Sequence, residues 1–145
     1  MSEIQFRILL KNPLPGIDFA LQQGQGSAYE TIQKQRSALT DLVFTFSVEV
    51  KKNKQGEPDF RGPLVQGPAG ERFVYIDIGT YAGQLGTEWS RRLKVPLRNL
   101  TWENIDKAIA GPNLVFEIHI PGTGKDGGPT CGTVKPFDGW KLVKQ

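Results

Sequence analysis

Residues 42–51 read Leu-Val-Phe-Thr-Phe-Ser-Val-Glu-Val-Lys, and apolar and polar side chains alternate along most of this stretch. One phase is wholly apolar: Leu42, Phe44, Phe46, Val48 and Val50. The other phase carries Thr45, Ser47, Glu49 and Lys51. Because successive side chains of a β-strand point to opposite faces, this period of two predicts a strand with one buried face.

The same period recurs on both sides of this stretch. It predicts further strands over 4–10, 74–78, 91–97 and 114–120, with a short closing strand over 140–143. Pro96 lacks a backbone N–H, so it restricts the 91–97 strand to a sheet edge or makes Pro96 the strand's end. From the apolar phases of the three strongest runs we expect six core residues: Phe44, Phe46, Val74, Ile76, Phe116 and Ile118.

One short helix is predicted near residues 102–110. Thr101 suits the N-cap, Glu103 suits the positive end of the helix dipole, and Ile105 and Ala108 have helical spacing. Gly111, followed by a proline, ends the helix.

Residues 29–35 allow two interpretations. Ser27 and Glu30 have the spacing of a capping box, which favours a helix. A hairpin between residues 19–22 and 29–35 fits the strand-rich surroundings better, but the sequence leaves both open.

The composition is that of one folded domain spanning residues 1–145. The chain has 145 residues with a net charge of +3, and its 17 Gly and 10 Pro indicate many turns. These values exclude a collagen-like chain, a disordered tail and a disulfide scaffold. We predict a mostly β fold, an antiparallel β-sandwich with one short helix; a closed β-barrel is the alternative.

The chain has one cysteine, Cys131, and one histidine, His119, so no intramolecular disulfide and no multi-histidine metal site is expected. We therefore expect no metal, no cofactor and no catalytic residue. Polar residues interrupt the apolar ones in residues 1–10, unlike a signal peptide, and no stretch is long and apolar enough to cross a bilayer. A cytoplasmic protein without membrane contact is expected.

Two places could form a binding site. The connection over residues 53–71 is long and lacks a periodic pattern, which is typical of functional loops, and it holds Asp59 and Arg61. In the 74–78 strand, Tyr75 and Asp77 stand on the face opposite the apolar phase, and aromatic rings beside a carboxylate make a usable pocket wall. Arg91 and Arg92 are the candidate partners for Asp77. The predicted ligand-binding residues are Asp59, Arg61, Tyr75, Asp77 and Arg91.

Several longer strings carry a family resemblance: residues 59–63, 65–68, 73–79, 89–96 and 121–129. On these strings the chain resembles a family of small, mostly bacterial proteins catalogued only as a domain of unknown function. The resemblance covers nearly the whole chain and implies a free-standing domain, with no activity or site residue to carry over.

The function predicted from the residues is a non-catalytic module that binds a small polar ligand or a protein partner. The alternatives are a carboxylate-dependent enzyme acting on a small substrate and a weak nucleic-acid binder. The basic residues Lys51, Lys52, Arg91 and Arg92 do not form the dense stripe typical of nucleic-acid binders, which disfavours the last. The oligomeric state is not indicated.

Overall fold

The structure is a computed structural model that describes residues 2–11, 13, 16–22, 31–38, 40–68, 70–81, 87–97, 100–111, 113–121 and 139–145. The side chains of residues 22, 31–34, 78–81, 87–92 and 121 lie outside that description. The elements are β1 (Ser2–Lys11), β2 (Ile17–Gln22), β3 (Thr31–Arg36), β4 (Leu42–Lys52), β5 (Pro58–Arg61), β6 (Phe73–Tyr81), β7 (Thr87–Pro96), α1 (Trp102–Ala110), β8 (Leu114–Pro121) and β9 (Lys141–Lys144).

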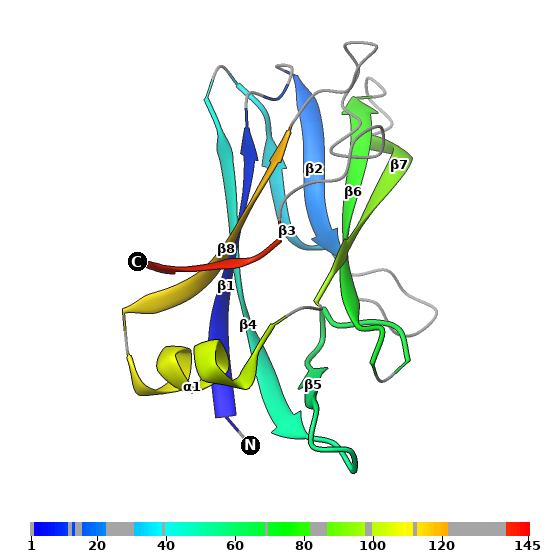
Figure 1. The fold of residues 1–145 in the computed structure, drawn as a ribbon. Helices are drawn as coiled ribbons and strands as arrows, with labels where there is room; N and C mark the ends of the chain where they lie inside the picture. Colours follow the sequence, from blue (N-terminus) through cyan, green and yellow to red (C-terminus); the bar gives the residue numbers. More distant parts are fainter. Residues whose placement is uncertain are drawn as a thin grey trace.

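The strands form two sheets that face each other (Figure 1). The first sheet has the order β5-β4-β1-β8-β9, and the second has the order β3-β2-β6-β7. The predicted β-sandwich is thereby confirmed, and the described strands do not close into a barrel. Strand β7 lies at an edge of its sheet and ends at Pro96, as the missing N–H of proline requires.

One strand pair departs from the predicted antiparallel arrangement. Strands β1 and β8 run parallel, from Phe6 opposite Phe116 to Lys11 opposite Pro121. Between β7 and β8 the chain passes through α1, which lies at the lower end of the molecule in Figure 1, where β1 also starts. Strand β8 therefore enters the sheet from the same end as β1, and a crossover connection of this kind produces parallel pairing.

The core lies between the two sheets and is built from the apolar phases of the strands. All six predicted core residues are buried: Phe44, Phe46, Val74, Ile76, Phe116 and Ile118. The ring of Phe6 in β1 is the centre of this packing, with its centroid 5.4 Å from the ring of Phe46 on one neighbouring strand and 5.4 Å from that of Phe116 on the other.

The hairpin interpretation is confirmed for residues 31–35, the part of the 29–35 range that the structure describes. Strands β2 and β3 pair antiparallel, with Asp18 opposite Arg36 and Leu21 opposite Gln33. The capping-box residues Ser27 and Glu30 lie outside the described residues.

Helix α1 has the predicted limits. The Thr101 side chain accepts a hydrogen bond from the backbone N–H of Asn104, and Ile105 and Ala108 are buried. The Trp102 indole N–H donates to the carbonyl of Gly56 at 2.8 Å, which ties the helix to the turn between β4 and β5. In the described part of the chain, no helix is long and apolar enough to cross a membrane.

The sequence pattern did not reveal strand β5, which lies inside the connection predicted over residues 53–71. It pairs with the end of β4, placing Asp59 opposite Lys51 and Phe60 opposite Val50. Beyond β5, Leu64 and Val65 are buried against the body of the protein, as their apolar character suggests. Four residues with two inward positions are too few to establish a period of two by themselves.

Candidate functional site

The strand β5 places Asp59 and Arg61 on the same face, because they are two residues apart. Arg61 donates from Nε to Oδ2 of Asp59 at 3.0 Å. Arg72, just before β6, donates from Nε to the other carboxylate oxygen, Oδ1, at 3.2 Å. The Asp59 side chain is 3% exposed, so one buried carboxylate holds two guanidinium groups.

The two arginines keep Asp59 ionised. Burial by itself raises the pKa of the Asp59 carboxyl, but the hydrogen bonds and positive charges of Arg61 and Arg72 outweigh it and bring the pKa below its usual value. Asp59 therefore accepts hydrogen bonds at neutral pH and has no proton to give.

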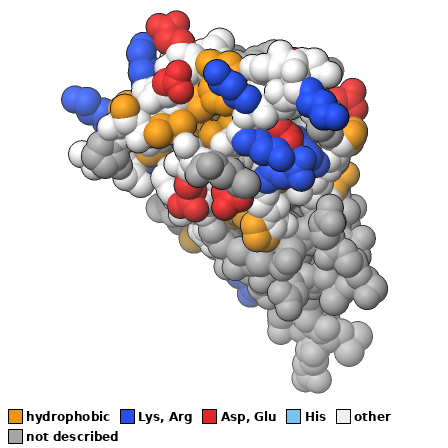
Figure 2. All heavy atoms as spheres, turned by 90° about the horizontal axis from the view of Figure 1, so that it is seen from below, with side chains coloured by type: hydrophobic (Ala, Val, Ile, Leu, Met, Phe, Trp, Pro, Cys, Tyr) orange, Lys and Arg blue, Asp and Glu red, His pale blue; other side chains and the backbone are white. Residues whose placement is uncertain are grey.

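Basic side chains surround this carboxylate in a cleft of about 480 Å³, which we call the basic cleft. Its lining comes from the end of β4, the following turn, β5 and one glycine of the next segment: Lys51, Lys52, Asn53, Lys54, Gln55, Glu57, Asp59, Arg61 and Gly70. Figure 2 views the molecule from this end and shows Lys and Arg side chains gathered around an acidic one. Four cations face two carboxylates, and one of these, Asp59, is already paired.

The turn that carries Lys54 is held by a side chain. The Asn53 Oδ1 accepts from the backbone N–H of Gln55 at 2.9 Å and from that of Glu57 at 2.8 Å. Lys52 lies over the Trp102 ring, 5.4 Å from its centroid. The cations of the basic cleft are thus carried by an ordered hairpin.

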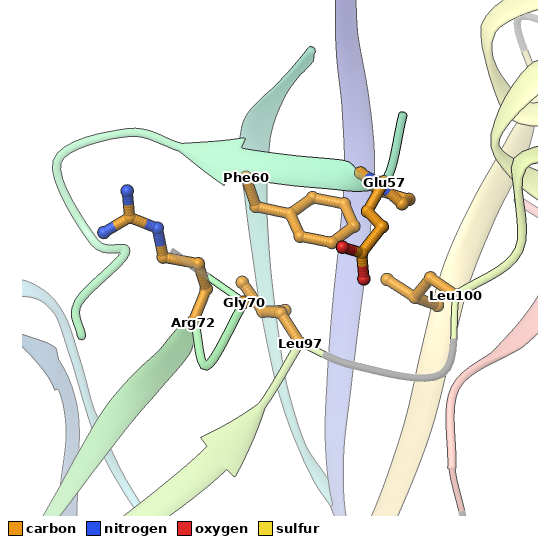
Figure 3. A pocket seen from close by; sticks show the side chains of 7 residues that line it. Glu57, Phe60, Gly70, Arg72, Leu97 and Leu100 are labelled. Atoms are coloured by element: carbon orange, nitrogen blue, oxygen red, sulfur yellow. The ribbon is translucent and has the colours of Figure 1, made fainter. Parts of the chain in front are cut away.

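A smaller hollow of about 180 Å³ adjoins the basic cleft, and we call it the apolar pocket (Figure 3). It is lined by Glu57, Pro58, Phe60, Gly70, Arg72, Leu97 and Leu100. Glu57 and Gly70 line both hollows, so the two spaces meet there.

The predicted residues on β6 lie in the other sheet. Tyr75 is half-buried and Asp77 is buried, on the face away from the Val74 and Ile76 core positions. The Tyr75 ring packs against that of Phe73, with centroids 4.8 Å apart. Neither Tyr75 nor Asp77 is among the residues that line the basic cleft.

Arg91 stands opposite Ile78 in the β6–β7 ladder, while Asp77 stands opposite Arg92. The side chains of Arg91 and Arg92 lie outside the described part of the structure. Of the five predicted site residues, the structure brings together Asp59 and Arg61.

Sequence reasoning missed Arg72 and the lysines of the basic cleft as site residues. The sequence did mark the lysines, since Lys51, Lys52 and Lys54 form a basic block and no basic block of the chain is longer. Arg72 had none, because its partner Asp59 is thirteen residues earlier and the contact depends on how the intervening segment folds back.

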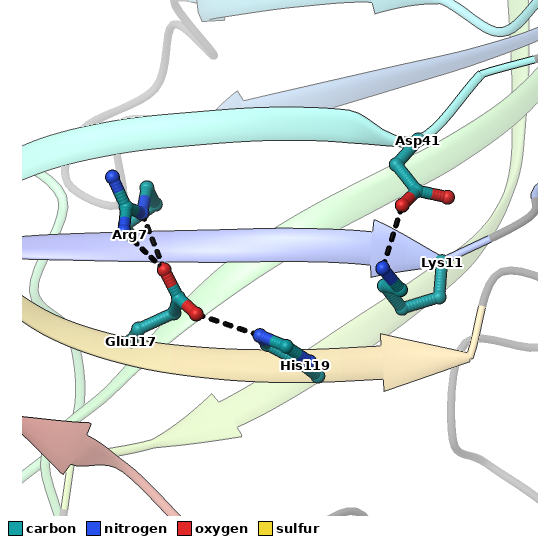
Figure 4. Close-up of polar contacts among 5 residues, drawn as sticks. All are labelled: Arg7, Lys11, Asp41, Glu117 and His119. Atoms are coloured by element: carbon teal, nitrogen blue, oxygen red, sulfur yellow. Dashed lines mark hydrogen bonds and ion pairs between the residues drawn. The ribbon is translucent and has the colours of Figure 1, made fainter. Parts of the chain in front are cut away.

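A second polar cluster lies on the outer face of the first sheet (Figure 4). Arg7 in β1 donates from Nε to Oε2 of Glu117 in β8 at 2.6 Å, and His119 Nε2 lies 2.6 Å from Oε1 of Glu117. Burial raises the pKa of the Glu117 carboxyl, but the hydrogen bonds from His119 and Arg7 outweigh it and lower the pKa. Because both oxygens of Glu117 are engaged, we interpret this cluster as a cross-link between the two parallel strands.

Carboxylate, imidazole and thiol groups do not gather into a metal centre in the part of the chain that the structure describes; no three of them come together there. Cys131, the one cysteine of the chain, lies outside the described residues.

Comparison with known proteins identifies the chain at the level of its family. The model of a family of unknown function (DUF5990) matches residues 4–143, so the chain belongs to that family. No curated protein and no solved structure matches the chain.

Proposed function

We propose that this member of the DUF5990 family is a non-catalytic module that binds a small anionic ligand in the basic cleft. The observation that carries the proposal is the charge of the cleft, whose lining holds the four cations Lys51, Lys52, Lys54 and Arg61 against two carboxylates. One of these carboxylates, Asp59, is also paired with Arg72 from outside the cleft, so positive charge is in excess. Cations grouped at a concave surface attract an anion more strongly than the same charges spread over a flat one.

The shape of the cleft favours a small ligand over a protein partner. Its volume of about 480 Å³ lies within the range of small-molecule sites, roughly 300–1,000 Å³. A protein partner needs a broad, complementary surface instead.

The electrostatics of Asp59 favour binding over acid catalysis. A general acid that works near neutral pH needs a raised pKa, as in a carboxyl buried without a cationic partner. The pKa of Asp59 is lowered instead, because Arg61 and Arg72 hold its charged form. Asp59 then serves to fix the Arg61 guanidinium at the cleft.

A cytoplasmic location is part of the proposal. It rests on the sequence, in which a single cysteine allows no intramolecular disulfide.

Titration calorimetry with inorganic phosphate tests the proposal. The double variant Lys51→Gln/Lys54→Gln removes two cations of the cleft, and Lys107→Gln/Lys144→Gln removes two exposed lysines that do not line it. We expect phosphate to bind the wild type, with an affinity that falls as salt is raised. The cleft variant should bind about tenfold more weakly or worse, while the control should bind like the wild type.

Equal affinities for the two double variants would show that net charge, and not the cleft, attracts the anion, and would refute the proposal. An oligonucleotide that binds much more tightly than phosphate, with contacts spread beyond the cleft, would replace the small-ligand proposal with the nucleic-acid alternative.

A further inference from the structure

The apolar pocket opens beside the basic cleft, and its lining combines four apolar residues with the charged Glu57 and Arg72. Phe60 comes from β5, and Leu97 and Leu100 both lie in the connection from β7 to α1, so two segments form an apolar wall (Figure 3). All three side chains are buried, and their inner sides belong to the hydrophobic core. Core residues therefore pack behind these three side chains and hold the wall of the pocket in place.

The size of the apolar pocket sets the size of the group that it can take. An apolar cavity of roughly 150 Å³ in another protein accepts a benzene molecule. The apolar pocket has about 180 Å³, so a six-membered ring or a short branched chain fits it.

Glu57 stands where the two hollows meet. It lines both of them, and in Figure 3 its carboxylate reaches toward Leu100 across the pocket from Arg72. Asn53 holds the backbone of Glu57, accepting from its N–H at 2.8 Å and donating to its carbonyl at 2.9 Å. A carboxylate at this junction repels an anion but attracts an ammonium group.

From this arrangement we propose that the ligand is a small zwitterion of the α-amino-acid type with an apolar side chain. The proposal rests on the proposed function, because the ligand's carboxylate binds the cations of the basic cleft. Its side chain enters the apolar pocket against Phe60, Leu97 and Leu100, and its ammonium group lies at Glu57. In the ligand one carbon carries the carboxylate, the ammonium group and the side chain. Because Glu57 lines both hollows, it meets the ammonium group while the carboxylate enters the cleft and the side chain enters the pocket.

Four probes separate these contacts by titration calorimetry. Inorganic phosphate reports on the basic cleft alone. Propionate and 3-phenylpropionate differ by an aromatic ring, and 3-phenylpropionate and phenylalanine differ by the ammonium group. We expect 3-phenylpropionate to bind about tenfold more tightly than propionate, since the pocket removes the ring from water, and phenylalanine to bind more tightly again.

Two variants assign each gain to its residue. Leu100→Phe fills the apolar pocket, so 3-phenylpropionate should bind this variant no more tightly than propionate does. Its affinity for phosphate should be unchanged. If Leu100→Phe lowers the melting temperature too far for the titration, Leu97→Phe replaces it. Glu57→Gln should cancel the advantage of the ammonium group and tighten propionate binding, because it removes a negative charge. Glu103→Gln, an exposed glutamate of α1 that lines neither hollow, is the matched control.

The outcomes distinguish the two proposals. If phosphate binds at the cleft but the ring or the ammonium group adds no affinity, the zwitterion proposal is overturned and the anion-binding function stands. If neither phosphate nor any carboxylate binds, the proposed function itself is overturned.

Discussion

Arg72 donates from Nε to the Asp59 carboxylate at 3.2 Å, and this contact joins the edge strand of one sheet to the entry of the other. Asp59 belongs to β5, and Arg72 directly precedes β6. The backbone carbonyl of Arg72 also accepts a hydrogen bond from the N–H of Leu97 at 2.8 Å. The Nη1 of the Arg72 side chain donates to the carbonyl of Gly67. The same residue thus supports the basic cleft, the apolar pocket and the packing of the two sheets.

Replacing Asp59 with Asn should destabilise the protein by about 2–3 kcal/mol. The variant weakens two charge-assisted hydrogen bonds and leaves Arg72, which is 16% exposed, without its anionic partner. Urea denaturation measures the change in the free energy of unfolding. Glu103→Gln, which breaks an exposed pair with Lys107, should change it by less than about 1 kcal/mol. Equal losses for the two variants would contradict the structural role of Asp59.

Because the pKa of Asp59 is lowered, we expect its contribution to the stability of the folded protein to be lost at acid pH. The pKa of Asp59 is lower in the folded protein than its usual value of 3.8, which we take for the unfolded chain. Its contribution to stability is therefore complete above that value and is lost as pH falls through the folded-state pKa.

The measurement is the difference in unfolding free energy between the wild type and Asp59→Asn, taken from pH 7 downward. Taking the difference cancels the separate contribution of Glu117, whose pKa is also lowered. We expect it to be constant near neutral pH and to shrink below about pH 4. A difference that grew on acidification would reverse the sign and contradict the assignment.

Truncating Phe46 to Ala should cost about 3–5 kcal/mol. The ring is 6% exposed and stacks on Phe6, so its removal loses apolar burial and leaves a cavity. Val43 lies on the same strand but is 42% exposed, and Val43→Ala should cost much less. If Phe46→Ala kept the denaturation midpoint of the wild type, the register of β4 would be wrong.

Gly67 should tolerate alanine less well than Gly56. Both have positive φ values, +91° and +79°, so an alanine at either position meets backbone strain. At Gly67 the added Cβ would also lie 2.6 Å from Cε1 of Phe73 and 2.7 Å from the carbonyl oxygen of Glu71, whereas at Gly56 it meets nothing within 4 Å. We expect Gly67→Ala to cost about 1–3 kcal/mol more than Gly56→Ala by thermal denaturation. Similar melting temperatures would show that the segment around Gly67 can shift.

Phosphate affinity should be unchanged by Cys131→Ser, and by removing divalent metal through dialysis against EDTA followed by dialysis into buffer without it. In the proposed function, the lysine and arginine side chains that line the basic cleft bind the anion, and that contact needs neither a thiol nor a metal ion. The affinities are compared at a temperature at which both proteins are folded, because the substitution can alter stability. A large loss of affinity on chelation or in the serine variant would favour a metal- or thiol-dependent site.

The two parts of the candidate site differed in how far they could be predicted. Asp59 and Arg61 are two residues apart in one extended segment, so their pairing follows from local geometry. Tyr75 and Asp77 share a face for the same reason, but they lie on β6 in the second sheet, whereas β5 belongs to the first. Nothing in the spacing of residues 59–77 shows on which sheet each strand will lie.

The sequence by itself determined the features that depend on neighbouring residues. The period of two along β4 set which of its side chains are buried, and Thr101 and Gly111 set the limits of α1. These patterns are local, because the face of a strand or helix repeats every few residues. Only the tertiary structure decided the parallel pairing of β1 with β8, the strand β5, and the contact of Arg72 with Asp59. Each of these depends on where distant segments meet, and that is set by the packing of the whole core rather than by any single stretch of chain.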